Sequence, residues 1–389
     1  MADGGPAPVV LVCPQEFKGS LTAIEAAHAI AEGVRDALGP DVAIRELPLG
    51  DGGPGTVDAC IEAMDAERVR IEVVGHQGEP TEAAYALLDA ERGATAIIES
   101  AAACGLVAVE PGDRRPVTAS TFGVGQLIAD AIERGAARVI VGVGGTGTND
   151  GGAGAALALG LRQLDSLGVA IEPGALGLTR LASLERDDTL RSLRGAELCI
   201  AVDVTNALLG HEGATAIYGA QKGVRDWQVP ALDSALAHWA AVIEQDLGCP
   251  LADLPGAGAG GGLPVGLLAS AHAADGTATI ESGAALVAGL VQLDAAIAAA
   301  DLIVTGEGSI DAQTAYGKTV GYVAERAAQA GRDCLAIGGR VDGRLAGILD
   351  VEASAPDDVS VEEAMALGAE PVRAAADRVV RRWLEARAR

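Results

Sequence analysis

The chain has 389 residues with a formal net charge of −26 at pH 7, and 49% of its residues are hydrophobic while only 2% are aromatic. So strong an excess of acid argues against nucleic acid and anionic membrane surfaces as partners. The length predicts two or three domains, whose cores must be built from aliphatic side chains.

The six cysteines are scattered without CxxC or Cys/His spacing, so we expect reduced thiols and no zinc site. The N-terminal sequence MADGGPAPVV has no basic or apolar leader, and no apolar run of about 18 residues follows. We therefore expect a cytoplasmic protein that binds small molecules. The sequence leaves open whether it forms a homodimer.

The first segment alternates short strands with helices. We expect strands over 9–13 and 43–47, a helix from Ser20 or Thr22 to about Leu38, and a helix that begins near Thr56. This rhythm is typical of a parallel α/β layer, in which ligands bind at the carboxyl ends of the strands. Lys18 and Asp51 follow these strands, so both are expected at that edge.

The middle of the chain has a different pattern, since strands over 69–74, 83–89 and 94–98 follow one another without helices. This pattern predicts a second unit that contains antiparallel strands. Further on we expect helices over 122–134 and 229–247 and strands over 139–143 and 197–202. The run PGAGAGGG at 255–262 is expected to form an unpacked loop or a hinge.

The α/β rhythm returns near the C-terminus, with expected strands over 302–305 and 334–337 and helices over 317–330 and 371–388. Because both ends of the chain share it, we infer one discontinuous domain with a second domain inserted. The fold class is therefore α/β with two domains. We place the discontinuous domain at 1–67 and 292–389, and the inserted mixed α/β domain at 68–291.

A glycine-rich loop follows the strand over 139–143 and precedes a helix expected over 151–159. Its glycines expose backbone N–H groups, its other residues add hydroxyls and an amide, and a helix N-terminus favours anions such as phosphate. We therefore expect a nucleotide or phosphate site. Its candidate residues in the loop are Gly144, Gly145, Thr146, Thr148 and Asn149.

Lysine is rare, because only three of the 28 basic residues are lysines and each of the three stands beside a glycine. A compact ammonium aimed at a phosphate cannot be replaced by a planar guanidinium, whereas an ordinary surface cation can. The alternative explanation is that codon bias removed most lysines and left these three at random positions. We favour ligand contacts, at Lys18 for the substrate and at Lys222 and Lys318 for nucleotide phosphates.

Five carboxylates occupy glycine-rich loops after expected strands. Any one alone is more often a helix cap or turn residue, but together with the lysines they supply what phosphoryl transfer needs: metal ligands, cations and a base. Asp51 and Asp203 are both candidates for the base. The candidate ligands of Mg²⁺ are Asp150, Asp203, Glu307 and Asp311.

Two other nucleotide motifs match less well. Gly142–Gly147 fits G-x-G-x-x-G, but the glycines run on where a Rossmann helix should already have begun. Gly317 and Lys318 resemble the end of a P-loop whose first glycine is replaced by Ala312. A nicotinamide-dependent oxidoreductase stays an alternative, whereas no G-x-S-x-G elbow supports a serine hydrolase.

The chain resembles the class I glycerate kinases. The matching segments are EFKGSLTAIEAA, PLGDGGPGT, IESAAACGL, TFGVGQLI, VGVGGTGTNDGGAGAALALG, DVTNALLGHEGATAIYGAQKG, PGAGAGGG and TGEGSIDAQTAYGKT, in the family's order. The resemblance implies two α/β domains, the one built from both termini being flavodoxin-like. It also implies phosphorylation of D-glycerate to 2-phosphoglycerate with ATP and Mg²⁺, and we expect direct in-line transfer in the cleft between the domains.

Ten residues stand at the family's motif positions: Lys18, Asp51, Asn149, Asp150, Asp203, Asn206, Lys222, Glu307, Asp311 and Lys318. We assign Lys18, Asp51 and Asn206 to the substrate, and Asp203, Asp51 and Lys222 to catalysis. The chain departs from the family pattern at Gln15, Glu16, Pro54 and Ser309, where Asp, Ser, Glu and Arg are usual. These departures leave open another small hydroxy acid as the substrate, or a sensor of ATP or glycerate that does not catalyse.

Overall fold

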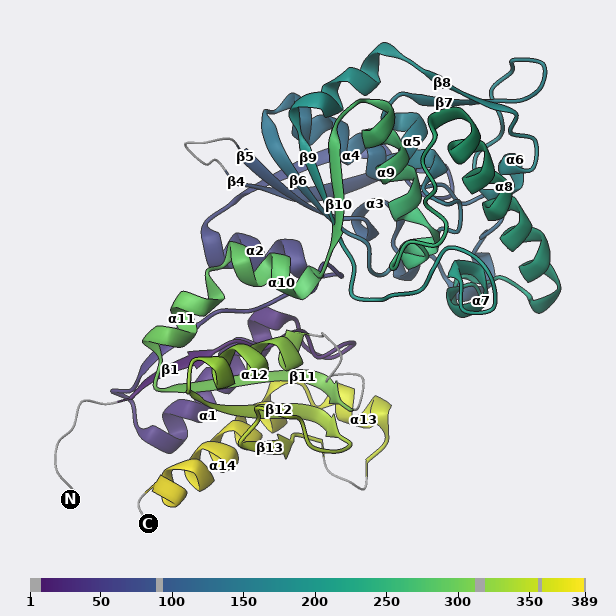
Figure 1. Cartoon of the computed structure of the whole chain (residues 1–389). Helices are drawn as coiled ribbons and strands as arrows, with labels where there is room; N and C mark the ends of the chain where they lie inside the picture. The colour runs from purple at the N-terminus through teal and green to yellow at the C-terminus, as the bar shows by residue number, and fades with distance from the viewer. Residues whose placement is uncertain (1–7, 89–93, 312–318, 356–358, 388–389) are drawn as a thin grey trace. The chain divides into compact units, whose positions relative to one another are not determined.

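The computed structural model describes residues 8–88, 94–311, 319–355 and 359–387. The chain divides into two compact units (Figure 1). The first comprises Met1–Asp51, Asp58–Asp65 and Ala284–Arg389, and the second comprises Gly52–Val57 and Ala66–Gly283. The first unit therefore includes segments from both ends of the chain.

The first unit contains a five-stranded sheet in the order β13-β12-β11-β1-β2, in which every neighbouring pair is parallel. In chain order along the unit this is the flavodoxin-like order 2-1-3-4-5. Its strands are β1 (Val9–Val12), β2 (Ala43–Glu46), β11 (Leu302–Ile310), β12 (Asp333–Val341) and β13 (Asp350–Ala353).

Helices cover both faces of this sheet because its strands are apolar on both sides. Val10 and Val12 belong to a core with α1 and α14, while Leu11 and Cys13 belong to a second core with α11 and α12. The helices of this part of the chain are α1 (Ala23–Leu38), α10 (Gly283–Leu290), α11 (Leu293–Ala299), α12 (Thr319–Gln329), α13 (Val361–Ala366) and α14 (Ala369–Arg387).

The second unit contains a mixed six-stranded sheet in the order β10-β9-β6-β5-β4-β3. Strands β10, β9, β6 and β5 are parallel, whereas β4 runs antiparallel to β5 and β3. The strands are β3 (Glu67–Val74), β4 (Pro80–Leu88), β5 (Ala94–Glu99), β6 (Ala136–Gly142), β9 (Glu197–Ala201) and β10 (Thr277–Glu281), and a separate antiparallel pair is formed by β7 (Leu161–Leu164) and β8 (Ser183–Arg186).

Helices and short 3₁₀ turns connect these strands. One large aliphatic core holds them, with the fully buried Trp239 of α8 donating from its indole Nε1 to the carbonyl of Gly151 at 2.9 Å. The helices are α3 (Ala101–Cys104), α4 (Phe122–Glu133), α5 (Ala153–Ala158), α6 (Ala175–Leu178), α7 (Ala214–Tyr218), α8 (Val229–Leu247) and α9 (Leu263–Ala273). Helix α2 (Thr56–Met64) begins in this unit, but from Asp58 on it belongs to the first unit. None of the described helices is long and apolar enough to cross a membrane.

The structure confirms the expected α/β class, with a parallel sheet in one unit and a mixed sheet in the other. One local expectation is wrong, because the glycine-rich run at 255–262 packs. Most of it is buried, and a Cβ on Gly261 would overlap the carbonyl oxygen of Thr148. The lack of side chains is what lets this segment lie against the loop after β6.

Candidate active site

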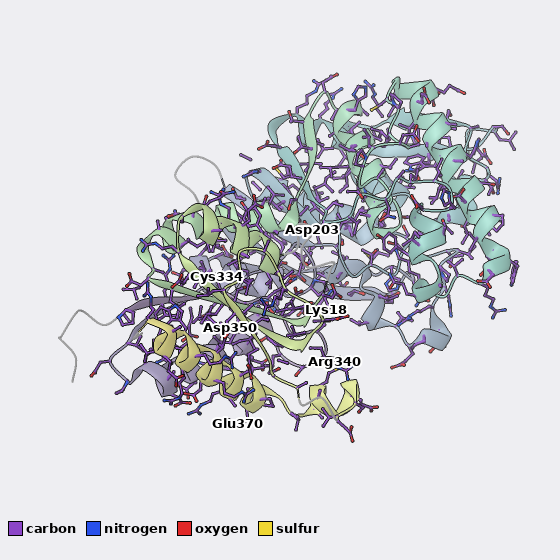
Figure 2. All side chains as sticks on the ribbon, turned by 60° about the horizontal axis from the view of Figure 1, so that its bottom comes forward. Lys18, Asp203, Cys334, Arg340, Asp350 and Glu370 are labelled. Carbon is purple, nitrogen blue, oxygen red and sulfur yellow. The ribbon has the colours of Figure 1, made fainter. Side chains whose placement is uncertain are left out.

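A pocket of about 420 Å³ lies at the carboxyl edge of the parallel sheet in the first unit. Figure 2 shows Lys18 and Arg340 at this edge, and Cys334 and Asp350 toward the edge where β12 and β13 begin. After β1 the chain continues to β2, which pairs with one side of β1, while β11 pairs with the other side of β1. This is the topological switch point, where open α/β sheets bind ligands.

A tight turn after β1 brings Lys18 to the pocket. The Phe17 N–H donates to the carbonyl of Leu21 at 2.8 Å, and the turn leads to α1, which Thr22 begins with a capping box. A Cβ on Gly308 would lie only 3.1 Å from the backbone nitrogen of Lys18. Glycine at 308 therefore allows the turn to lie against β11.

Asp51 follows β2 and receives a hydrogen bond in the pocket wall. The side-chain amide of Gln15, which is almost fully buried, donates to Asp51 Oδ2 at 2.6 Å. Beside them, partial burial raises the pKa of Glu16, with Lys18 lowering it and Asp51 raising it further. All four side chains, Gln15, Glu16, Lys18 and Asp51, line the pocket.

The strand β11 supplies two further acids, Glu307 within it and Asp311 just after it. Glu307 is 7% exposed, so its carboxylate lies in a largely desolvated wall. Arg340 of β12 lies opposite Ser309 in the strand register and also lines the pocket. Arg340 donates a hydrogen bond from Nη2 to the carbonyl of Val359 at 3.2 Å.

In the second unit, the loop after β6 is held by a buried lysine. Lys222 is 2% exposed and donates from Nζ to the carbonyl oxygen of Thr148 at 2.6 Å and to Thr146 Oγ1 at 3.3 Å. Burial lowers the pKa of Lys222 to about 8. Gly144 and Gly145 of the same loop are exposed. The lysine thus stabilises the loop in this conformation, and its predicted phosphate contact stays a prediction.

Asp150 ends the same loop in complete burial. Its Oδ2 accepts hydrogen bonds from the N–H and hydroxyl of Thr121 and from the N–H of Gly154, and its Oδ1 accepts one from the N–H of Gly152. Burial raises the pKa of Asp150, and these hydrogen bonds lower it in part. The two oxygens thereby connect the loop to the starts of α4 and α5, and the predicted role of Asp150 as a metal ligand stays a prediction.

The remaining predicted residues of the second unit have local partners. Asn149 Nδ2 donates to Thr215 Oγ1 at 3.0 Å, and Asp203 Oδ1 accepts from the N–H of Gly283 at 2.9 Å. Asn206 donates to the carbonyl of Glu212 and accepts from the hydroxyl of Tyr218 at 2.6 Å. These bonds shape the loops after β6 and β9, so a ligand role for Asn206 would compete with them.

The structure thus brings together Lys18, Asp51, Glu307 and Asp311 in the pocket of the first unit. Thr146, Thr148 and Lys222 form a second cluster in the other unit. The predicted residue Lys318 lies outside the described residues.

The sequence reasoning missed Arg340, Ser354 and Met365, all of which line the pocket. The expected strand ended at Ile337, but β12 continues to Val341. Ligands bind at the carboxyl ends of parallel strands, so the correct length of β12 would have indicated Arg340 as a pocket residue. Met365 carries no such signal, because α13 is a short helix whose position depends on tertiary packing.

The parallel sheet and the pocket at its switch point are typical of an α/β enzyme that binds a small molecule. A family model described as the glycerate kinase family matches residues 10–384. A glycerate kinase of Halalkalibacterium halodurans is 38% identical over 92% of this chain and 94% of that protein. The glycerate 2-kinase of Escherichia coli is 38% identical over 79% of each.

Among solved structures, a protein of Salmonella typhimurium LT2 assigned as glycerate kinase 2 matches with a TM-score of 0.84 and 37% identity, covering 98% of this chain and 100% of that one. The two-unit chain is therefore similar in sequence and in fold to the same group of kinases. The chain belongs to the glycerate kinase family. It is an enzyme that transfers a phosphoryl group.

Proposed function

We propose that this enzyme transfers the terminal phosphoryl group of ATP to D-glycerate and forms 2-phosphoglycerate. The observation that carries the proposal is the presence of Lys18, Asp51, Glu307 and Asp311 in one pocket at the switch point of the parallel sheet. The similarity to the E. coli glycerate 2-kinase supports the position of the phosphate on the product. Phosphoryl transfer depends mainly on positioning and charge stabilisation, which such a pocket can supply.

The carboxylates of the pocket are suited to a magnesium ion shared with the nucleotide. Among the described residues, no group of three or more His, Cys, Asp and Glu side chains could hold a metal ion by itself. Mg²⁺ in kinases usually takes only one or two carboxylates, with phosphate oxygens and water completing its shell. We assign Glu307 and Asp311 to this role. When bound, Mg²⁺ would neutralise the developing charge on the phosphate oxygens.

We assign the role of general base to Asp51, with Asp203 as the alternative. The Asp51 carboxylate accepts the proton of the glycerate hydroxyl as the hydroxyl oxygen forms its bond to the γ-phosphorus. The bond between that phosphorus and the β–γ bridging oxygen breaks in the same in-line step, and ADP leaves. The Gln15 amide orients the carboxylate through its 2.6 Å hydrogen bond. The Lys18 ammonium binds the anionic oxygens of the substrate in an otherwise acidic protein.

The test is to incubate the purified chain with ATP, Mg²⁺ and D-glycerate and to follow the products by phosphorus NMR. We expect ADP and a new phosphomonoester whose phosphorus signal is a doublet, because the 2-phosphate couples to a single methine proton. A triplet would identify the 3-phosphate and overturn the assigned position. Intact ATP would overturn the proposed reaction, and turnover restored by another hydroxy acid would reassign the substrate.

A substitution tests the assignment of Asp51 as the general base. Asp51→Asn keeps the size of the side chain and removes its ability to accept the proton, so we expect turnover at least about a hundredfold lower. Asp203→Asn is the matched comparison in the other candidate. A loss confined to Asp203→Asn would move the base to that residue.

A further inference from the structure

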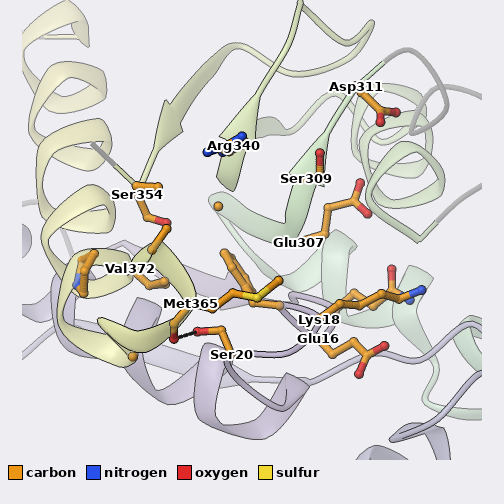
Figure 3. Close-up of a pocket in the computed structure, with 18 of the residues that line it drawn as sticks. Glu16, Lys18, Ser20, Glu307, Ser309, Asp311, Arg340, Ser354, Met365 and Val372 are labelled. Atoms are coloured by element: carbon orange, nitrogen blue, oxygen red, sulfur yellow. Dashed lines mark hydrogen bonds between the residues drawn. The ribbon is translucent and has the colours of Figure 1, made fainter. Parts of the chain in front are cut away.

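The pocket of the first unit has two chemically different halves. One half follows β1, β2 and β11 and is charged, whereas the other lies against β13, α13 and α14 and is mainly apolar (Figure 3). The charged half contains Glu16, Lys18, Asp51, Glu307 and Asp311. The apolar half contains Ala355, Ala364, Met365, Pro371 and Val372. Phe17 comes from the loop after β1, but its side chain belongs to the same hydrophobic cluster as Val372 and also lines the pocket.

The pocket is larger than D-glycerate, the proposed phosphoryl acceptor, requires. Its lining residues follow all five strands, and five strands at the usual spacing form an edge about 19 Å long. A volume of about 420 Å³ is in the range of small-molecule and cofactor sites. A three-carbon acid with four oxygens has no use for the apolar half, so a larger ligand must account for it.

Met365 is held in place over this half. The hydroxyl of Ser20 donates to the carbonyl of Met365 at 3.0 Å, which connects α13 to the turn after β1. A Cβ on Gly19 would lie 3.2 Å from the thioether sulfur, so the Met365 side chain covers the bare backbone of that turn. Met365 is nevertheless 39% exposed. A polarizable thioether presented in this way is suited to the face or edge of a flat aromatic ring.

We propose that the apolar half of the pocket binds the base of the nucleotide, between Phe17, Met365 and Val372. This inference rests on the proposed use of ATP as the phosphoryl donor. Arg340 lies between the two halves because β12 lies between β11 and β13. Its guanidinium is therefore placed for the phosphates nearest the ribose, and the terminal phosphate extends toward Glu307 and Lys18.

The glycine-rich loop of the second unit was the site expected for the nucleotide from the sequence. Its hydroxyl and carbonyl groups at Thr146 and Thr148 are already bound by the buried Lys222. The pocket of the first unit, in contrast, offers an open volume with an apolar end. The geometry therefore favours the first unit for the base.

Calorimetric titration of the full chain with ADP and, separately, with inorganic pyrophosphate tests the assignment. Met365→Ala should weaken ADP binding about tenfold, because it removes the apolar contact with the base, and leave pyrophosphate binding unchanged. Ala364→Phe, which fills the same end of the pocket, should weaken ADP binding at least as much. Leu367→Ala is the matched control, since this side chain is 48% exposed on the same segment and does not line the pocket.

The thermal unfolding temperature of each variant checks that it folds. Unchanged ADP affinity in folded Met365→Ala and Ala364→Phe would overturn the inference, as would equal weakening of pyrophosphate binding. Absence of phosphoryl transfer to glycerate while ADP binding still depends on Met365 would overturn the proposed reaction alone. The two failures are thereby distinguishable.

Discussion

Gln15 donates its side-chain amide to the carboxylate of Asp51 at 2.6 Å. This contact joins the loop after β1 to the loop after β2. The glycerate kinase pattern that the chain resembles usually has an acid at position 15, so this enzyme replaces a second carboxylate by an amide. The substitution removes one negative charge and gives Asp51 a fixed donor.

The first prediction concerns this donor. Gln15→Ala should lower kcat about tenfold while changing the KM for glycerate much less, since a hydrogen bond to a charged group orients Asp51 in the reacting complex. Gln329→Ala, at an exposed position of α12, is the control for amide loss. Steady-state kinetics at saturating ATP would measure both. An unchanged kcat in Gln15→Ala would show that the contact does not contribute to turnover.

A second prediction concerns the metal. Glu307→Gln should raise the Mg²⁺ concentration for half-maximal activity by at least about tenfold, because a ligand loses its charge. Glu325→Gln changes an exposed acid on α12 and should leave this concentration unchanged. Titration of activity with Mg²⁺ after removal of metal by a chelator gives the comparison. Identical titrations for both variants would exclude Glu307 as a ligand.

The buried ammonium of Lys222 predicts a pH-dependent stability. Its pKa is lowered to about 8 from the ordinary 10.5, so the unfolded chain holds this proton more strongly than the folded chain between those values. The stability of the wild type should therefore rise as the pH increases from 8 toward 10.5. Below pH 8 both states are protonated, and the contribution is constant.

Thermal unfolding of the wild type and of Lys222→Met measures this contribution. The difference in Tm between the two should grow in favour of the wild type between pH 8 and pH 10. Lys18→Met removes an exposed lysine and controls for loss of charge alone. A difference in Tm that stays flat across this range would contradict the lowered pKa.

The close packing of the glycine-rich run gives a fourth prediction. Gly261 and Gly248 both have positive φ, at 75° and 71°, but only Gly261 has neighbours where a Cβ would lie. Alanine at either site incurs the cost of the left-handed conformation, and at 261 it also meets the Thr148 carbonyl. Gly261→Ala should lower Tm by about 5 °C or more beyond Gly248→Ala. Equal losses would mean that the segment tolerates a side chain.

Local patterns predicted much of the fold. The alternation of short strands with helices at both ends of the chain predicted the parallel α/β layer. The expected capping residues before α1 include Thr22, whose side chain accepts a hydrogen bond from the Glu25 N–H. The helix expected over 229–247 is observed as Val229–Leu247. Placing strand ends at one edge also grouped Lys18 with Asp51 correctly in a single pocket wall. These features depend on residues that are close together in the sequence, so local sequence patterns were sufficient to predict them.

The remaining features depend on contacts between distant segments. The strand expected over 334–337 is longer in the structure, because pairing with β11 extends β12 to Val341, and Arg340 lines the pocket. The burial of Lys222 follows from the packing of the segment around α7 and the loop after β6, and no local pattern marks it. For the same reason the sequence does not indicate that Lys222 donates to the Thr148 carbonyl and the Thr146 hydroxyl.

The discontinuity of the first unit affects how the enzyme is made. Strands β1 and β2 leave the ribosome first, but β1 is an inner strand whose partner β11 is synthesised about three hundred residues later. The second unit is nearly continuous in sequence, so all of it is synthesised before β11, the partner of β1. A polypeptide released before β12 would lack Arg340 and the helices behind it. A prematurely terminated chain of this kind would therefore contain the whole sequence of the second unit but lack part of the proposed nucleotide pocket.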